Sequence, residues 1–165
     1  IDKTFDQMNL IDQNKKDQEG IYIFSKEHTH HYITAYRMYL DNKILGVGVK
    51  NFRKFCSNER YIESQLSCAS HPHNTYLQIL SEIGIIGFLF LIIVIFYFFK
   101  NIIKHSKFRL KGKYFFNDFE ICILSGIIIY LWPVIPTGSV FNNWLNILMI
   151  LNLPFLIWSR KSINT

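Results

Sequence analysis

Four residues at the start of a long apolar segment, His71-Pro72-His73-Asn74, carry the side chains best suited to chemistry in this sequence. Histidine accepts or donates a proton near neutral pH, so His73 is a candidate general base. Pro72 favours a helix just after it, which predicts that His73 and Asn74 lie on the first turn of that helix. The exposed amides of a helix start disfavour a cation, so we expect a neutral His73. On residues alone, a histidine that only caps its helix or hydrogen-bonds to the backbone is the favoured interpretation.

Arg37 is the second candidate, because a planar guanidinium can bind phosphate oxygens through two hydrogen bonds. Arg53 is a weaker choice for the same role. The residues leave an alternative open, in which Arg37 lies beside Tyr36 and Tyr39 or pairs with Asp41 four positions later.

Three further histidines, His28, His30 and His31, invite interpretation as a metal site. Adjacent and alternate residues do not share a helical face, and no carboxylate or thiol falls at ligand spacing. We therefore expect no metal site.

The elements that must position these side chains are apolar blocks. Half of the 165 residues are hydrophobic, and they occur in runs rather than with the periodicity of a soluble core. Leu77 to Phe99 carries only Glu82 as a charge and is long enough to cross a bilayer. Phe119 to Ile135 and Val140 to Trp158 are two shorter candidates, interrupted by Pro133 and Pro154.

The basic residues predict the orientation. Residues 100–113 carry six Lys and Arg side chains and no acid, which is typical of a cytoplasmic loop. Residues 1–75 then lie outside, with ten basic and nine acidic side chains. The net charge of +6 is thus mostly a topology signal, which argues against a nucleic-acid partner. Outside the cytoplasm, Cys56 and Cys68 either form a disulfide or remain two thiols.

We therefore predict an all-α membrane protein with a mostly helical external loop region at residues 1–75. Transmembrane helices are expected at 76–100, 118–136 and 143–159, with a basic cytoplasmic loop at 101–117, a short turn at 137–142 and a tail at 160–165. Three helices are few for enclosing a polar site in lipid, so we expect the C-terminal part of a larger protein.

Two patterns resemble a known family. His73-Asn74, then nine residues, then Gly84-x-x-Gly87 and an apolar helix resembles the signature of the bacterial O-antigen ligase and polymerase family of integral membrane glycosyltransferases. Arg37, the segment 44–48 (Ile-Leu-Gly-Val-Gly) and Asn51-Phe52 resemble a pattern in that family's large periplasmic loop. The two glycines, one helical turn apart, would let another helix approach closely.

The resemblance implies transfer of a glycan from undecaprenyl diphosphate to an acceptor hydroxyl on the periplasmic face of the bacterial inner membrane, without a metal or other cofactor. The acceptor would be a glycan, lipid A-core or a protein. The resemblance and the residue chemistry together make His73 and Arg37 the catalytic candidates and Asn74 and Arg53 the substrate-binding ones.

Two alternatives remain. A protein O-glycosyltransferase of the same family would share the chemistry and differ in the acceptor. A proton-coupled transporter would use His73 and Glu82 as a relay, but both lie at the edge of the apolar segment, and no ionisable residue occupies the middle of any of the three segments.

Overall fold

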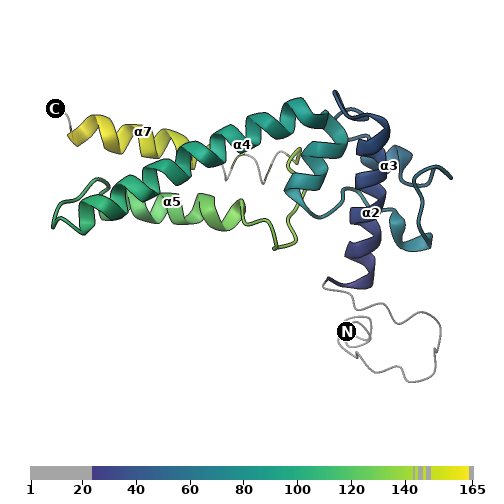
Figure 1. Cartoon of the computed structure of the whole chain (residues 1–165), viewed down its shortest axis with the longest axis horizontal. Coiled ribbons are helices and arrows are strands. Elements are labelled where there is room, and N and C mark those ends of the chain that lie inside the picture. The colour runs from purple at the N-terminus through teal and green to yellow at the C-terminus, as the bar shows by residue number, and fades with distance from the viewer. Residues whose placement is uncertain (1–23, 143, 145–146, 148–149, 164–165) are drawn as a thin grey trace, which may run out of the picture.

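The computed structural model describes residues 24–142, 144, 147 and 150–163. Every regular element in this part of the chain is helical, which confirms the all-α prediction. The first 23 residues of the predicted external region, and several residues of the predicted third spanning helix, lie outside the described residues. The elements are α2 (Lys26–Asp41), α3 (Phe52–Phe55), η1 (Gln65–Ser67), α4 (Thr75–Arg109), α5 (Asp118–Tyr130) and α7 (Asn152–Ile163) (Figure 1).

Helix α4 is the longest element and extends along the molecule (Figure 1). Of the helices in the described part, it alone is long and apolar enough to cross a membrane, judged by length and composition. Its 35 residues correspond to about 50 Å at ~1.5 Å per residue, more than a hydrocarbon core of ~30 Å. Many large apolar side chains on α4 are exposed, as on a surface that faces lipid: Ile86, Leu89, Phe90, Ile93, Phe96 and Tyr97.

Helix α4 is interrupted at Gly84, whose φ of 75° and ψ of −163° are not helical. A neighbouring loop supplies the hydrogen bonds that the interruption removes. The amides of Val47 and Gly48 donate to the carbonyls of Ser81 and Glu82 at 2.8 and 2.9 Å. The amide of Ile85 in turn donates to the carbonyl of Lys43 at 2.8 Å.

Glycine is required on both sides of this junction. A Cβ atom at Gly84 would lie 2.3 Å from the carbonyl oxygen of Ile44, and one at Gly46 would lie 2.4 Å from the carbonyl carbon of Glu82. The expectation that Gly84 and Gly87 admit a second helix is therefore wrong for Gly84, which admits a loop backbone. A Cβ at Gly87 would meet Ile83 of its own helix.

The second predicted span is shorter in the structure, and the third is described only in part. Helix α5 has 13 residues and ends at Tyr130, three positions before Pro133, whereas α7 has 12 residues and carries Pro154 in its first turn. A spanning helix needs about 20 residues, so three transmembrane helices are not confirmed. The predicted loop at 101–117 also changes, because α4 continues as a helix to Arg109.

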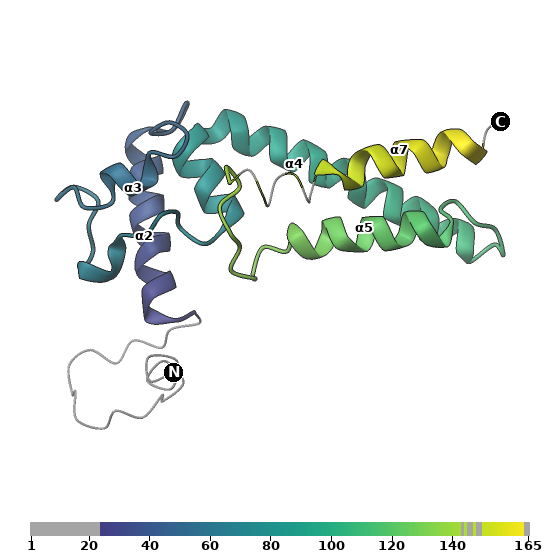
Figure 2. The ribbon, with the colours of Figure 1, turned by 180° about the vertical axis from the view of Figure 1, so that it is seen from behind.

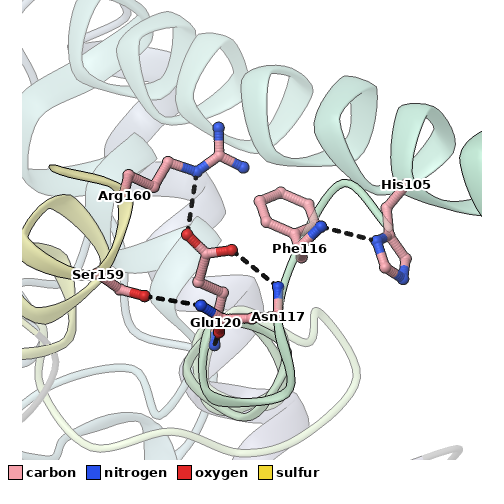
Figure 3. Close-up of polar contacts among 6 residues, drawn as sticks. All are labelled: His105, Phe116, Asn117, Glu120, Ser159 and Arg160. Atoms are coloured by element: carbon pink, nitrogen blue, oxygen red, sulfur yellow. Dashed lines mark hydrogen bonds and ion pairs between the residues drawn. The ribbon is translucent and has the colours of Figure 1, made fainter. Parts of the chain in front are cut away.

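Helices α4 and α5 pack through apolar side chains, and α7 joins them at the far end from α2 (Figures 1 and 2). Three polar contacts hold this end together (Figure 3). Arg160 pairs with the buried Glu120 at 3.3 Å, and Asn117 donates to Ser159 at 3.0 Å. The amide of Phe116 donates to Nδ1 of His105 at 3.1 Å.

Helix α2 crosses the start of α4 and forms a second, smaller core (Figure 1). Its buried positions, His31, Thr34, Ala35 and Met38, recur at helical spacing. Phe52 and the disulfide between Cys56 and Cys68 cover this face, so the pairing that the sequence left open is present.

Replacing Gly84 by Ala is expected to destabilise the protein by more than about 1–3 kcal/mol, the usual cost of a strained backbone, because the methyl group also meets Ile44. Gly126→Ala is the matched control, since a Cβ atom there has nothing within 4 Å. Thermal unfolding in detergent would measure both. Equal unfolding temperatures for the two variants would contradict the interlock of loop and helix.

Candidate functional site

The carboxylate of Glu82 fixes the loop that follows α2. Glu82 is 1% exposed, and its two oxygens accept the amides of Lys50 and Phe52 at 3.0 and 2.9 Å. Nε2 of Gln78, one turn earlier on α4, donates to the same carboxylate at 3.3 Å. Glu82 is thus a satisfied structural carboxylate, which also leaves little capacity for the relay that a transporter would require.

Residues 131–142 lie against the start of α4 on another side (Figure 2). The amide of Thr137 donates to the carbonyl of His73 at 2.9 Å. Gln78 holds the next part of the segment, since it donates to Ser139 at 2.9 Å and accepts the amide of Val140 at 2.9 Å. Three stretches distant in the sequence therefore meet around the first turns of α4.

His73 lies just before α4 rather than on its first turn, which corrects the sequence prediction. The helix begins at Thr75, and Asn74 is its N-cap, with its side-chain oxygen accepting the amides of Tyr76 and Leu77. The side-chain nitrogen Nδ2 of Asn74 donates to the carbonyl of Pro133 at 3.0 Å. Asn74 was predicted to bind substrate. In the structure its side chain makes these hydrogen bonds within the protein, and through them it positions the neighbouring His73.

Four imidazoles gather at this point. The ring centre of His73 lies 4.1 Å from His71, 5.2 Å from His28 and 5.4 Å from His31. His28 and His31 come from one face of α2, three residues apart. The sequence analysis considered adjacent and alternate spacings and missed this pair.

The hydrogen bonds of His71 define its tautomer. Nε2 contacts the carbonyl oxygen of Thr137 at 3.2 Å, which can only accept, so Nε2 carries the proton. Nδ1 then accepts from the hydroxyl of Ser70 at 2.8 Å. His31 is 7% exposed, and its Nδ1 has no hydrogen-bond partner.

Burial is the largest cause that lowers the pKa of His73 from 6.5 to about 4, followed by the nearby charges of His71, His31 and His28 in that order. The expectation of a neutral imidazole is therefore confirmed, with burial and neighbouring histidines as the cause. Burial also lowers the pKa of His31 and of His71. His31, His71 and His73 resist protonation because an added charge on any of them would lie in a partly dry site beside other imidazoles.

A pocket of about 360 Å³ opens beside His71. Among the described residues, its lining combines cationic, aromatic and hydrogen-bonding side chains without a carboxylate: Lys50, Arg53, Ser70, His71, Ser139, Phe141, Asn142 and Trp144. Arg53, the weaker sequence candidate, thus lies in the pocket.

Backbone strain is concentrated at the same place. Within the described residues, Lys50 and His73 are the non-glycine positions with positive φ, at 60° and 56°. Such conformations persist only where the surroundings fix them, and they are common at functional sites. One of these residues lines the pocket and the other contacts His71, which also lines it.

Arg37 has partners outside this pocket. Its guanidinium pairs with Glu63 and donates to the carbonyl of Ile62 at 2.9 Å. The alternative pairing with Asp41 is wrong, because Asp41 accepts from Arg60 at 2.9 Å. No group of three or more His, Cys, Asp or Glu side chains in the described ranges is arranged to hold a metal ion.

These features describe an α-helical membrane protein with a histidine cluster and a basic pocket at the start of its candidate spanning helix. Residues 7–92 match the O-antigen ligase family. The match covers more than half of the chain, which therefore belongs to this family, as the His-Asn and Gly-x-x-Gly patterns predicted. No curated protein and no solved structure matches the chain.

Membership of this family gives the chain a role in glycan transfer at a membrane. The matched range includes α2, the loop on Glu82, His73 and the first part of α4. Residues 131–142, which complete the pocket, lie beyond it.

We expect His73 to stay neutral down to about pH 5 and to titrate near pH 4. Its pKa in the unfolded chain is the ordinary 6.5, so between these values the unfolded state binds more protons. Folding stability should therefore fall as the pH decreases through this window. His71→Asn should raise the pKa of His73, whereas the remote His105→Asn should not. Histidine NMR in detergent would measure each pKa, and a His73 value near 6.5 would refute the cluster's effect.

Proposed function

We propose that this protein is a glycosyltransferase that moves a glycan from undecaprenyl diphosphate to an acceptor hydroxyl on the periplasmic face of the bacterial inner membrane. The observation that supports this most is the placement of neutral His73 beside a basic pocket, at the start of the candidate spanning helix of an O-antigen ligase family member. A lipid-linked substrate would present its head group at this depth.

In the proposed reaction, His73 accepts the proton of the acceptor hydroxyl, whose oxygen attacks the anomeric carbon of the lipid-linked sugar. The bond between that carbon and the diphosphate oxygen breaks, and its electron pair leaves with the diphosphate. General-base assistance of this kind is typically worth ~100- to 10,000-fold in rate. The proton on His73 is then lost to solvent when the products leave, because burial and the neighbouring histidines disfavour a cation there.

The leaving diphosphate requires cations. We assign this role to Arg53 together with Lys50, because both line the pocket with His71 and none of its described lining residues is an acid. Arg37, the first choice from the sequence, is already paired with Glu63. It is better suited to holding residues 62–63 against α2. This chemistry needs no metal, and none enters the proposal.

Orientation follows from the basic residues of 100–113 and of the chain's end, which favour the cytoplasmic side for the far end of α4. The pocket then opens toward the periplasm. A polymerase, a lipid A-core ligase and a protein O-glycosyltransferase would catalyse the same transfer reaction, and they would differ only in the acceptor.

His73→Gly is the sharpest test of the base, because glycine adopts the positive φ of this position without strain and should preserve folding. We expect transfer to fall by ~100-fold or more. His30→Ala is the control, since His30 lies on α2 outside the ring cluster. The glycan ladder of cells producing each variant of the intact protein would measure activity, and normal transfer by His73→Gly would remove it as the base.

The same ladder identifies the acceptor when the protein is absent. Loss of chain length with single repeat units remaining would indicate a polymerase. Full-length chains that stay on the lipid carrier would indicate a ligase, and loss of glycan from proteins alone would indicate a protein glycosyltransferase.

Arg53→Ala should weaken binding of farnesyl diphosphate by ~10- to 150-fold, because a hydrogen bond to a charged group contributes about 1.5–3 kcal/mol. Arg37→Ala should instead leave binding nearly unchanged and lower stability by less than about 1 kcal/mol, as expected for a partly exposed ion pair. Calorimetry on the intact protein in lipid nanodiscs would separate these. If Arg37→Ala weakened binding and Arg53→Ala did not, Arg37 would be the residue that binds the diphosphate.

A further inference from the structure

The pocket beside His71 has a second side that the diphosphate role does not use. Trp144 is 79% exposed and lies in this pocket with Phe141 and Asn142, opposite in character to the cationic Lys50 and Arg53. A pocket that combines cations with an aromatic surface is suited to a ligand that is anionic at one end and presents the apolar face of a ring at the other.

We propose that the indole of Trp144 is the platform for the sugar ring attached to the diphosphate. The assignment rests on the proposed function and adds the part of the substrate that its cations do not recognise. One face of a pyranose ring consists mainly of C–H groups, whose hydrogens carry a small positive charge. The π face of an aromatic ring is negative, so the two surfaces attract when they stack.

The chain that leads to this aromatic surface is anchored near the cationic side of the pocket. The segment that carries it is held to α4 where Gln78 accepts the amide of Val140 at 2.9 Å and donates to Ser139 at 2.9 Å. Gln78 also donates to Glu82, whose carboxylate accepts the amide of Lys50. A short chain of hydrogen bonds thus joins the segment that leads to Trp144 to the loop that carries Lys50.

Tryptophans at a membrane surface commonly serve as interface anchors, and the other two in this chain fit that role. Trp158 is 66% exposed on α7, and Trp132 is 51% exposed beside an apolar pocket whose lining has no cation. Trp144 differs from them because it shares its pocket with Lys50, Arg53 and His71. Its surroundings therefore favour a polar ligand with an anionic group over lipid chains alone.

The test compares two probes, farnesyl diphosphate and farnesyl diphosphate carrying N-acetylglucosamine, on the intact protein in nanodiscs. The wild type should bind the sugar-bearing probe more tightly. Trp144→Ala should reduce that advantage by roughly 2- to 12-fold, the range for aromatic stacking, and leave binding of the sugar-free probe unchanged. Trp144→Phe should keep most of the advantage. Trp158→Ala is the matched control and should behave as the wild type.

The outcomes separate this inference from the function on which it rests. If Trp144→Ala binds both probes like the wild type, the sugar platform is refuted while the diphosphate site stands. If Trp144→Ala weakens both probes equally, Trp144 acts on the pocket as a whole and the platform is again refuted. If the wild type binds neither probe, the proposed function itself fails.

Discussion

The structure depends on the exchange of hydrogen bonds at Gly84. A helix that enters an apolar environment must satisfy its backbone internally, and an interruption normally leaves carbonyls and amides without partners. Here the loop after α2 supplies them, since Val47 and Gly48 donate to the freed carbonyls and Lys43 accepts from Ile85. The exchange allows α4 to kink at Gly84. It also fixes the loop to the helix by close backbone contacts that require glycine at positions 46 and 84.

The buried Glu82 extends this junction into the site. A carboxylate with little solvent is stable only when hydrogen bonds surround it, and Glu82 receives them from Lys50, Phe52 and Gln78. Gln78 also binds residues 139–140. The loop that carries Lys50 and the segment 139–140 are therefore both attached to the same turn of α4. Residues almost a hundred positions apart in sequence are therefore held in register by two adjacent side chains of α4.

The sequence was sufficient for the helical class, the long apolar α4 and the family, because each depends on local composition or on a short motif. It predicted a neutral His73 from the field of a helix start, whereas burial and the neighbouring histidines, two of them on the distant α2, are the causes in the structure. The sequence was insufficient to predict features that depend on contacts between distant segments. The role of Gly84 was assigned to helix packing because an interrupted helix and a continuous one share the same apolar pattern. Arg37 ranked above Arg53 because their partners, Glu63 for one and the pocket for the other, are set by folding. The two shorter apolar runs were extended through Pro133 and Pro154, where the described helices stop or start.

The basic pocket bears on how the histidine cluster could act in the proposed reaction. With a pKa of about 4, His73 is neutral at pH 7 but only a weak base, so by itself it would be a poor partner for a hydroxyl. An anion held by Lys50 and Arg53 would change this, because a nearby negative charge favours the imidazolium and raises the pKa. The proposed diphosphate would thus strengthen the base at the moment it is needed. Without that anion His73 stays weakly basic, since burial and the three neighbouring imidazoles hold its pKa near 4.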